Sequence, residues 1–326
     1  MSNNIDRPKI GLALSGGAGK AIAHIGILEE FTAAGIPIDY ICACSSAAIV
    51  AGSFASGTMP RLKADWLTLN RGFLFKLIQF DRNGKGVFSL DKAVAWAKTY
   101  LGEQNLEDMR PRLGFTCVDV LTGEPVLLSM GSILRAGQAC CSVPGLIEPV
   151  RWGNKLLVDG GLYNLVPTTQ AKEMGADIVI AVEIASARFM FTRKTYRLRD
   201  GYNFVRGSLP VRLYLAAHNF LDRIFTRSLD YIFYSQADLL EESHLDEPGM
   251  LGVLGRAIDI SNRQRRKFQG HIPDCDLLIT PKVKHIGKID LASAADMLAE
   301  GRRAARAALP EIRKKISEWE LKHSHA

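Results

Sequence analysis

Residues 9–34 read KIGLALSGGAGKAIAHIGILEEFTAA, and they decide the fold. The apolar run Lys9–Leu14 predicts a short buried strand, and the run Ala21–Ala34 predicts a helix. Only the glycine-rich segment Ser15–Lys20 separates the two. Strands that alternate with helices in this way favour an α/β protein with a largely parallel sheet.

The glycine-rich segment can bind an anion through its backbone. Glycines before a helix leave N–H groups free, and the helix dipole favours negative charge there. A phosphate-binding loop would need glycine at Leu14 and Ser or Thr at Ala21, and a dinucleotide-binding loop would need glycine at Ile22. The oxyanion of an acyl-transfer intermediate remains as a candidate, since it needs two or more N–H donors beside a nucleophile. A tight turn without a ligand is the alternative.

A second strand, residues 39–44, runs into Ser45 and a small-residue segment that predicts a helix. A serine at such a corner exposes its hydroxyl, as in a nucleophile elbow. The usual pattern Gly-x-Ser-x-Gly has alanine at both glycine positions here, Ala43 and Ala47. Ser46 allows a second register, but the predicted strand and helix favour Ser45. A helix cap is the alternative role for this serine.

A third strand, residues 155–159, ends in Asp159 and is followed by Gly160 and Gly161. A carboxylate beside a glycine turn can reach a nucleophile on a neighbouring strand without steric hindrance. The same three residues are also an ordinary turn signal. In parallel sheets, sites form beyond the carboxyl ends of the strands, so all three motifs can converge on one edge.

In their order and spacing these segments resemble the bacterial patatin-like phospholipase family. The similarity extends over residues 8–185 and continues more faintly through residues 274–281 and a helix at 291–309. The resemblance implies a three-layer α/β/α sandwich with a mostly parallel central sheet. Four stretches carry it: residues 11–17 with 23–28, residues 41–57, residues 134–136 with 142–145, and residues 157–161 with 164–167.

The family resemblance implies a lipid acyl hydrolase of the phospholipase A or lysophospholipase type, with a serine–aspartate dyad. Ser45 would be the nucleophile and Asp159 the base that takes its proton. Lys20 stands where the family places Arg or Lys after its glycines. No metal or organic cofactor is implied. The oxyanion hole would be formed by the backbone of four successive residues, Gly16, Gly17, Ala18 and Gly19.

Two alternatives to this assignment are open, and the first follows from departures from the family pattern. Alanine replaces glycine at four positions, which favours a catalytically weak or silent protein that binds membranes or regulates a partner: Ala18, Ala21, Ala43 and Ala47. A catalytic triad would instead need a histidine downstream of Asp159. The candidates are His218, His244, His271 and His285, none of which lies in a recognisable loop signature. His24 lies on the apolar face of the first helix, which indicates a structural role.

The composition, with 47% apolar and 23% charged residues among 326, is that of a globular protein with a large core. No run approaches 18 apolar residues, and the first residues lack the pattern of a signal peptide, so we expect a cytoplasmic protein, peripheral to a membrane where it meets lipid. The six cysteines lack metal-ligand spacing and predict buried thiols. Strand alternation predicts that the Cys44 side chain points away from Ser45.

We expect three segments: a catalytic core at 1–185, an insertion at 186–250, and a C-terminal part at 251–326 that completes the core domain. Between 186 and 237, nine basic residues face three acidic ones, with many aromatics between them. This composition predicts a lid or a contact with an anionic membrane surface, and a helix with a solvated arginine face is the alternative. No nucleic-acid motif accompanies the charge, and the oligomeric state is left open.

Further elements are predicted from the apolar pattern. Strands are expected at 113–119, 125–129, 177–184 and 275–281, and helices at 46–57, 89–101, 131–141 and 166–175. The basic residues from Glu300 onward predict a pair of solvated helices at the C-terminus.

Overall fold

The computed structural model describes residues 7–69, 77, 79–80, 88–184, 272, 274–283, 285–286 and 290–324. All of them belong to one compact unit. The predicted insertion at 186–250 lies outside the described residues, as do the membrane contact at 186–237 and three of the four downstream histidines, His218, His244 and His271.

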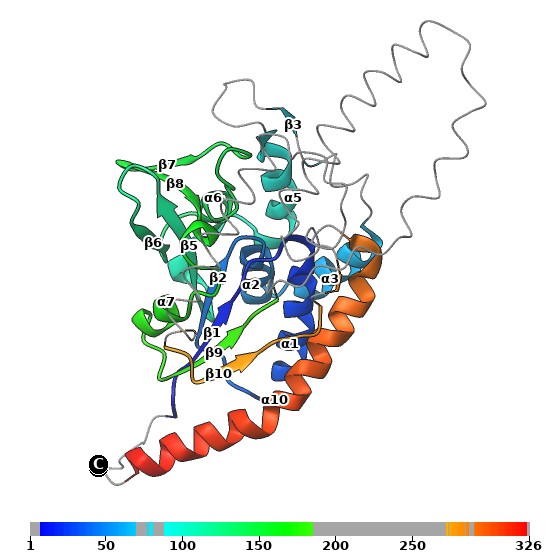
Figure 1. The fold of residues 1–326 in the computed structure, drawn as a ribbon, viewed down its shortest axis with the longest axis vertical. Helices are drawn as coiled ribbons and strands as arrows, with labels where there is room; N and C mark the ends of the chain where they lie inside the picture. The colour runs from blue at the N-terminus through cyan, green and yellow to red at the C-terminus, as the bar shows by residue number, and fades with distance from the viewer. Residues whose placement is uncertain are drawn as a thin grey trace, which may run out of the picture. The chain divides into compact units, whose positions relative to one another are not determined.

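A mixed, mostly parallel sheet forms the centre of the unit (Figure 1). The strands are β1 (Ile10–Leu14), β2 (Tyr40–Cys44), β5 (Arg112–Asp119), β6 (Pro125–Leu128), β7 (Val150–Trp152), β8 (Lys155–Asp159), β9 (Ile178–Val182) and β10 (Leu277–Ile279). Their order is β10-β9-β1-β2-β5-β8-β7, and β6 also pairs with β5. The pairs among β10, β9, β1, β2 and β5 are parallel, whereas β5–β6, β5–β8 and β7–β8 are antiparallel. A separate two-stranded ribbon joins β3 (Gln79–Phe80) to β4 (Phe88–Ser89).

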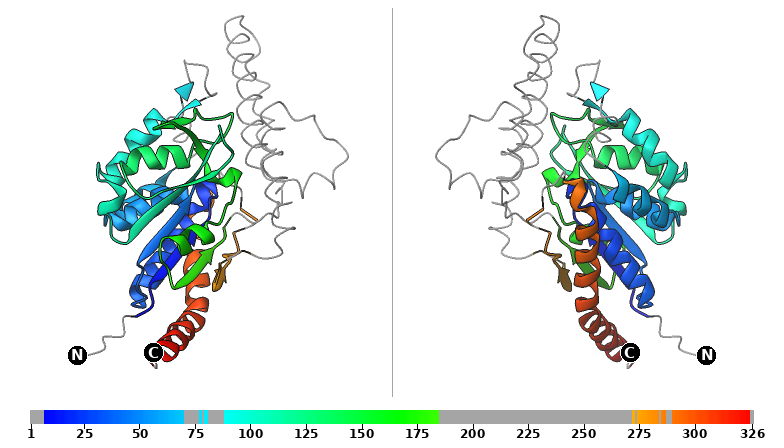
Figure 2. Two further views of the ribbon diagram at one scale, coloured as in Figure 1. Left: turned by 90° about the vertical axis from the view of Figure 1, so that its left-hand side faces the viewer. Right: turned by 90° about the vertical axis from the view of Figure 1, so that its right-hand side faces the viewer.

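Helices cover both faces of the sheet (Figure 2), which confirms the predicted three-layer α/β/α architecture. Alternate residues of the buried strands point to opposite faces: Leu12 packs in the larger core and Ala13 in the smaller one, beneath α7 (Thr168–Glu173). Six helices contribute to the larger core: α1 (Ile22–Ala33), α2 (Ala47–Ala55), α3 (Met59–Thr68), α5 (Asp91–Leu101), α6 (Ile133–Cys140) and α10 (Ala294–His323). Short 3₁₀ turns are η1 (Ala18–Ala21), η2 (Leu106–Asp108), η3 (Gly160–Leu162) and η7 (Leu291–Ser293).

One strand, β5, brings the ends of two others together. Thr116 pairs with β2 and β6 at once, and Cys117 pairs with β6 and β8 at once. Strands β2 and β8 therefore share the edge of β5 that is opposite β6. They approach from opposite directions, because β2 is parallel to β5 and β8 is antiparallel to it. They end at neighbouring positions, Cys44 opposite Thr116 and Asp159 opposite Cys117.

This pairing corrects one prediction. Asp159 was expected at the carboxyl edge of a parallel sheet, but β8 is antiparallel and meets β2 head-on. Alternation of apolar and polar residues along a strand determines which face is buried. It does not determine whether the strand runs parallel or antiparallel to its neighbour, so the sequence could not show the direction of β8.

The C-terminus is a single helix, α10 (Ala294–His323), and not the predicted solvated pair. Arg303, Arg306 and Lys314 are among the basic residues exposed along this continuous helix, and Pro310 lies inside it. Proline removes one backbone hydrogen bond, but the following turns are held by Ile312, which is buried, and by Ile316 and Trp319, which pack against the core.

Helices α1 and α10 touch backbone to backbone, and glycines allow this. A Cβ atom on Gly301 would lie 2.0 Å from the Ala23 carbonyl oxygen, and one on Gly26 would lie 2.3 Å from the Leu298 carbonyl oxygen. Ion pairs flank the contact, with Arg302 2.6 Å from Glu29. Because such partly exposed pairs contribute little, the close packing fixes α10 on α1, beside β1 and its loop.

We expect the substitution Gly301→Ala to lower the free energy of unfolding by about 3 kcal/mol, since the helices must move apart to admit a methyl group. Gly137→Ala is the matched control, because a Cβ on this helical glycine has its nearest neighbour at 4.0 Å. That variant should be neutral or stabilised by up to about 1 kcal/mol. Urea unfolding measures both, and equal stabilities would contradict the close contact.

Candidate active site

Ser45 lies at the bend between β2 and α2 with a positive backbone φ of 55°. This left-handed conformation costs a non-glycine residue about 1–3 kcal/mol and is concentrated at functional sites. The Ser45 carbonyl accepts a hydrogen bond of 2.9 Å from the Ala48 amide, which starts α2. Ser46 has helical φ and ψ at the N-cap position of α2. The backbone bend is therefore at Ser45, the position that the sequence favoured over Ser46.

Buried neighbours support the bend. The Ser45 amide donates to the Cys140 sulfur on α6 at 3.0 Å. Ala43 and Ala47, which replace the usual elbow glycines, are both fully buried in the larger core. Their methyl groups are therefore accommodated by core packing on either side of Ser45.

The glycine loop after β1 packs directly on this bend. A Cβ on Gly16 would lie 2.8 Å from the Ser45 Cβ and 3.3 Å from the Cys44 carbonyl oxygen. A Cβ on Gly17 would lie 2.8 Å from the Ile184 Cδ1. Glycine at both positions lets the loop backbone approach the serine closely.

The loop offers three backbone donors. The first hydrogen bond of its turn joins the Lys20 amide to the Gly17 carbonyl at 3.1 Å. The amides of Gly17, Ala18 and Gly19 precede that bond and so have no partner within the turn. The Gly16 amide, by contrast, donates to the Leu165 carbonyl at 3.4 Å. Of the four residues predicted for an oxyanion hole, the last three have the more available amides.

Ala18 departs from the ideal geometry of an anion-binding turn, and Lys20 lies at the end of the turn. Ala18 has a positive φ of 51°, a conformation that suits the glycine found there in the resembling family. Lys20 is 3% exposed at the end of the turn. The sequence therefore located the loop correctly, and the backbone strain at Ala18 is added by the structure.

Ser15 fixes the start of the loop. Its amide donates to the Val182 carbonyl at 3.0 Å, and its hydroxyl accepts from the Ile184 amide at 2.9 Å. Its carbonyl lies 2.8 Å from Nε2 of His24, which is fully buried. Burial lowers the pKa of His24 to about 4, against the smaller opposing effect of this hydrogen bond. The ring is therefore neutral and holds the loop in place, as the structural role predicted for it requires.

Asp159 ends β8 and is 5% exposed. Its Oδ1 atom accepts a hydrogen bond of 2.8 Å from the Gly161 amide and lies 3.8 Å from the Cys44 sulfur. Burial raises the pKa of Asp159 to about 6, although interactions with the Ser45 hydroxyl, the Gly161 amide and the Cys44 thiol oppose the rise. The carboxyl group can therefore exchange a proton near neutral pH.

Gly160 allows the chain to turn immediately after Asp159. A Cβ on Gly160 would lie 2.5 Å from both the carbonyl oxygen and the Oγ1 atom of Thr116. The turn η3 thus crosses the β5 backbone at the position where Cys44 pairs. The Asp-Gly-Gly segment is a turn, as one interpretation predicted, and it also holds the carboxylate beside the end of β2.

The structure brings together Ser45, Asp159 and the glycine loop. The contact of Cys44 with Asp159 was not predicted, because strand alternation ends where Ser45 takes a positive φ. Cys140 was also missed, since nothing in its helix marks a contact with the bend. Of the four downstream histidines, the described one, His285, is exposed and the structure gives it no hydrogen bond to the buried Asp159.

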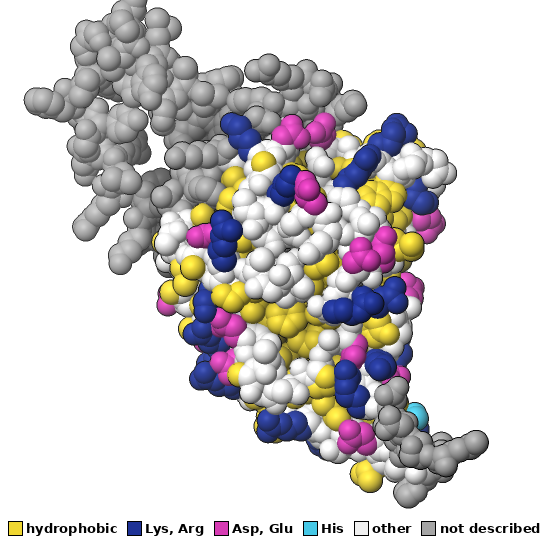
Figure 3. All heavy atoms as spheres, turned by 180° about the vertical axis from the view of Figure 1, so that it is seen from behind, with side chains coloured by type: hydrophobic (Ala, Val, Ile, Leu, Met, Phe, Trp, Pro, Cys, Tyr) yellow, Lys and Arg dark blue, Asp and Glu magenta, His cyan; other side chains and the backbone are white. Residues whose placement is uncertain are grey.

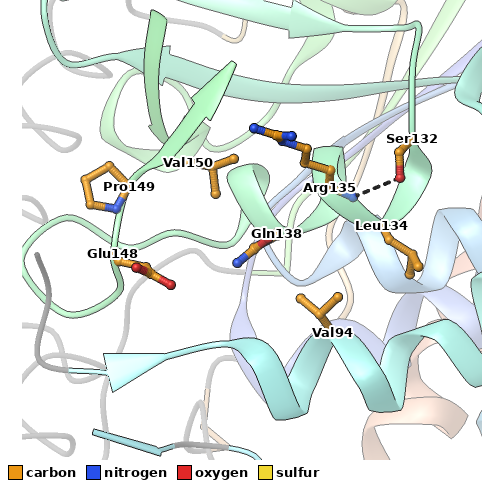
Figure 4. Close-up of a pocket in the computed structure, with 8 residues that line it drawn as sticks. All are labelled: Val94, Ser132, Leu134, Arg135, Gln138, Glu148, Pro149 and Val150. Atoms are coloured by element: carbon orange, nitrogen blue, oxygen red, sulfur yellow. Dashed lines mark hydrogen bonds between the residues drawn. The ribbon is translucent and has the colours of Figure 1, made fainter. Parts of the chain in front are cut away.

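A cavity of about 390 Å³ lies on the other side of α6 and includes none of the predicted site residues. Figure 4 shows Gln138 extending from α6 toward Glu148, with Val94 of α5 below. Arg135 donates to the Arg151 carbonyl at 2.5 Å. The lining is mixed in polarity: Val94, Ser132, Leu134, Arg135, Gln138, Glu148, Pro149 and Val150. Among the described residues, no group of three His, Cys, Asp or Glu side chains could hold a metal ion.

Known proteins resemble this chain in sequence. An uncharacterized NTE family protein of Mycobacterium bovis is 29% identical over 324 residues, covering 95% of this chain and 48% of that protein. A second uncharacterized NTE family protein, from Mycobacterium tuberculosis, is 26% identical over an alignment of 334 residues, covering 93% and 91%. Lysophospholipase nte1 of Aspergillus fumigatus is 27% identical over 195 residues, covering 54% of this chain and 12% of that protein. The chain spans about half the length of the first of these relatives.

Among solved structures, VipD from Legionella pneumophila aligns with a TM-score of 0.44 and 14% identity, over 93% of this chain and 67% of that chain. The family model of patatin-like phospholipases matches residues 12–172, which include the glycine loop, the bend at Ser45 and the turn after Asp159. This chain therefore carries a domain of the patatin-like phospholipase family.

Proposed function

We propose that this protein is a lipid acyl hydrolase that cleaves carboxylic esters of the phospholipase A or lysophospholipase type through Ser45 and Asp159. One observation carries the proposal: a serine in a strained conformation at the end of β2 meets a buried carboxyl group with a pKa of about 6 at the end of β8. The family match and the lysophospholipase relative support the same substrate class.

The proposed reaction has two steps. The Ser45 oxygen attacks the ester carbonyl while Asp159 accepts the hydroxyl proton, because a serine is a weak nucleophile without an adjacent base. Asp159 then gives this proton to the departing alcohol, which leaves an acyl group on Ser45. A water molecule, deprotonated by the same carboxylate, then attacks the acyl group and releases the fatty acid. Asp159 returns the proton to the Ser45 oxygen.

The amides of the glycine loop would stabilise the negative charge of the tetrahedral intermediate. The N–H groups of Gly17, Ala18 and Gly19 are the donors that we assign to this role, since Gly16 already donates to Leu165. Lys20, at the end of the turn, supports the loop in this proposal. The close approach of Gly16 to Ser45 supports this assignment, since an oxyanion hole must lie beside the nucleophile.

The substrate would be met at a lipid surface. The described helices include none that is long and apolar enough to cross a membrane. On the face drawn in Figure 3, Lys and Arg side chains are spread among Asp and Glu side chains and do not gather into one large basic patch. Attachment to an anionic membrane therefore remains a prediction that rests on residues 186–237, outside the described part of the chain.

A catalytically weak or silent binding protein is the second candidate. The specific observation in its favour is that Ala18 has a positive φ at a position where the family pattern has glycine, which adopts this conformation at lower cost. The buried Ala43 and Ala47 do not favour it, since core packing accommodates them.

We expect Ser45→Ala and Asp159→Asn each to lower kcat for short p-nitrophenyl esters about a thousandfold or more, because each removes one half of the proposed dyad. Ser46→Ala is the matched control and should retain most activity. Labelling with a fluorophosphonate, followed by peptide mapping, should place the adduct on Ser45. A folded wild-type protein that neither hydrolyses esters nor takes the label would favour the silent binding protein.

The pH dependence should report the buried base. Asp159 must be ionised to accept a proton, so kcat/KM should fall tenfold per pH unit below a pKa of about 6 and be level above it. Ester hydrolysis measured from pH 4.5 to 9, with circular dichroism as a control for unfolding, tests this. A rate that stays level down to pH 4.5 would argue against Asp159 as the base.

A further inference from the structure

Four cysteine thiols lie close enough to the Asp159 carboxyl group to be affected by its charge. After burial, which is the larger effect, the Asp159 carboxylate also raises the pKa of each of them, so all four stay protonated near neutral pH. They are Cys44 at the end of β2, Cys117 on β5, and Cys140 and Cys141 at the end of α6. Cys44, Cys117 and Cys140 are buried and Cys141 is partly buried, and buried, protonated thiols are poor nucleophiles and metal ligands.

Cys44 is the thiol that the structure places in hydrogen-bonding contact with the carboxylate. Its sulfur lies 3.8 Å from Oδ1 of Asp159, the same atom that accepts the Gly161 amide at 2.8 Å. Among the described residues, these two donors both act on Oδ1. Neither of these two donors acts on the other oxygen, Oδ2.

The contact follows from the strand geometry. Cys44 and Asp159 pair with successive residues of β5, Thr116 and Cys117, on the same edge of that strand. Cys44 is fully buried, so water does not compete for the contact. The thiol is fixed by the sheet itself and not by a flexible loop.

A thiol suits this position chemically. It is a weak donor, so it can orient a carboxylate while removing little of its basicity. A hydroxyl would donate more strongly and would favour the ionised carboxylate, which makes a weaker base. The groups that act on Asp159 here are the Ser45 hydroxyl, the Gly161 amide and the Cys44 thiol, and the charge of Asp159 in turn affects the thiols of Cys117, Cys140 and Cys141.

We propose that Cys44 is a positioning residue whose thiol, together with the Gly161 amide, holds Oδ1 of Asp159 so that Oδ2 faces the Ser45 hydroxyl. The expected effect of Cys44 on catalysis rests on the proposed function, whereas the contact between Cys44 and Asp159 does not.

The test compares Cys44→Ala and Cys44→Ser with Cys42→Ala, in the full chain. Cys42 is a matched control, because it is equally buried on the same strand but packs in the smaller core beneath α7. The pKa of Asp159 is read by infrared titration of its carboxyl band, which is assigned by its loss in Asp159→Asn. The pH profile of kcat/KM and the separate values of kcat and KM are measured in parallel.

Cys44→Ala should raise the pKa of Asp159 by about half a unit, the size expected for loss of one weak hydrogen bond. Cys44→Ser should lower the pKa of Asp159 by a similar amount. The acid limb of the kcat/KM profile should shift by the same amount as the pKa in each variant. In Cys44→Ala, kcat should fall severalfold at unchanged KM, whereas Cys42→Ala should change neither value.

An Asp159 pKa that is the same in both Cys44 variants as in Cys42→Ala would overturn the proposal. If Cys44→Ala does not fold, Cys44→Ser alone decides, since its shift has a defined sign. The infrared titration does not require an active enzyme, so it tests the contact of Cys44 with Asp159 independently of the proposed function. Full hydrolysis by Ser45→Ala would refute the proposed function and leave the thiol contact to be judged by the infrared result.

Discussion

Two strands that end head-on along one edge of β5 are the constraint on which the site depends. Strand β2 comes from one direction and β8 from the other, and they stop opposite the successive residues Thr116 and Cys117. Neither chain can continue straight, so each must turn out of the sheet at this point. The turn of β2 places Ser45, and the turn of β8 follows Asp159, so the same steric conflict brings a hydroxyl and a carboxyl group together.

This arrangement costs stability, and the surrounding packing offsets the cost. Ser45 and Ala18 adopt backbone conformations that disfavour a side chain, and Asp159 is a carboxyl group in a nearly dry environment. Glycines at 16 and 160 let the backbones approach closely enough for the contacts to form. A core built on both faces of the sheet, closed on one side by α10 against α1, holds these strained parts in place.

Much of the fold and of the candidate site could be predicted from the sequence, because both follow from local patterns. The apolar runs located β1, β2 and β8, and each candidate motif lies where such a run stops. Strand direction could not be predicted, since an isolated strand carries no signal for which neighbour it joins or in which sense. The contacts of Cys44 with Asp159 and of Cys140 with Ser45 were missed for a similar reason, because they join segments about a hundred residues apart. The single helix α10 depends on packing beyond Pro310 that no local pattern shows.

A crystal structure of the protein after reaction with a fluorophosphonate would test the central claim most directly. Our account predicts phosphorus bonded to the Ser45 oxygen, a phosphoryl oxygen facing the amides of Gly17, Ala18 and Gly19, and the Asp159 carboxylate within about 3.2 Å of the Ser45 oxygen or one water away. A carboxylate more than about 6 Å from that oxygen with no bridging water, or an adduct on another residue, would contradict it.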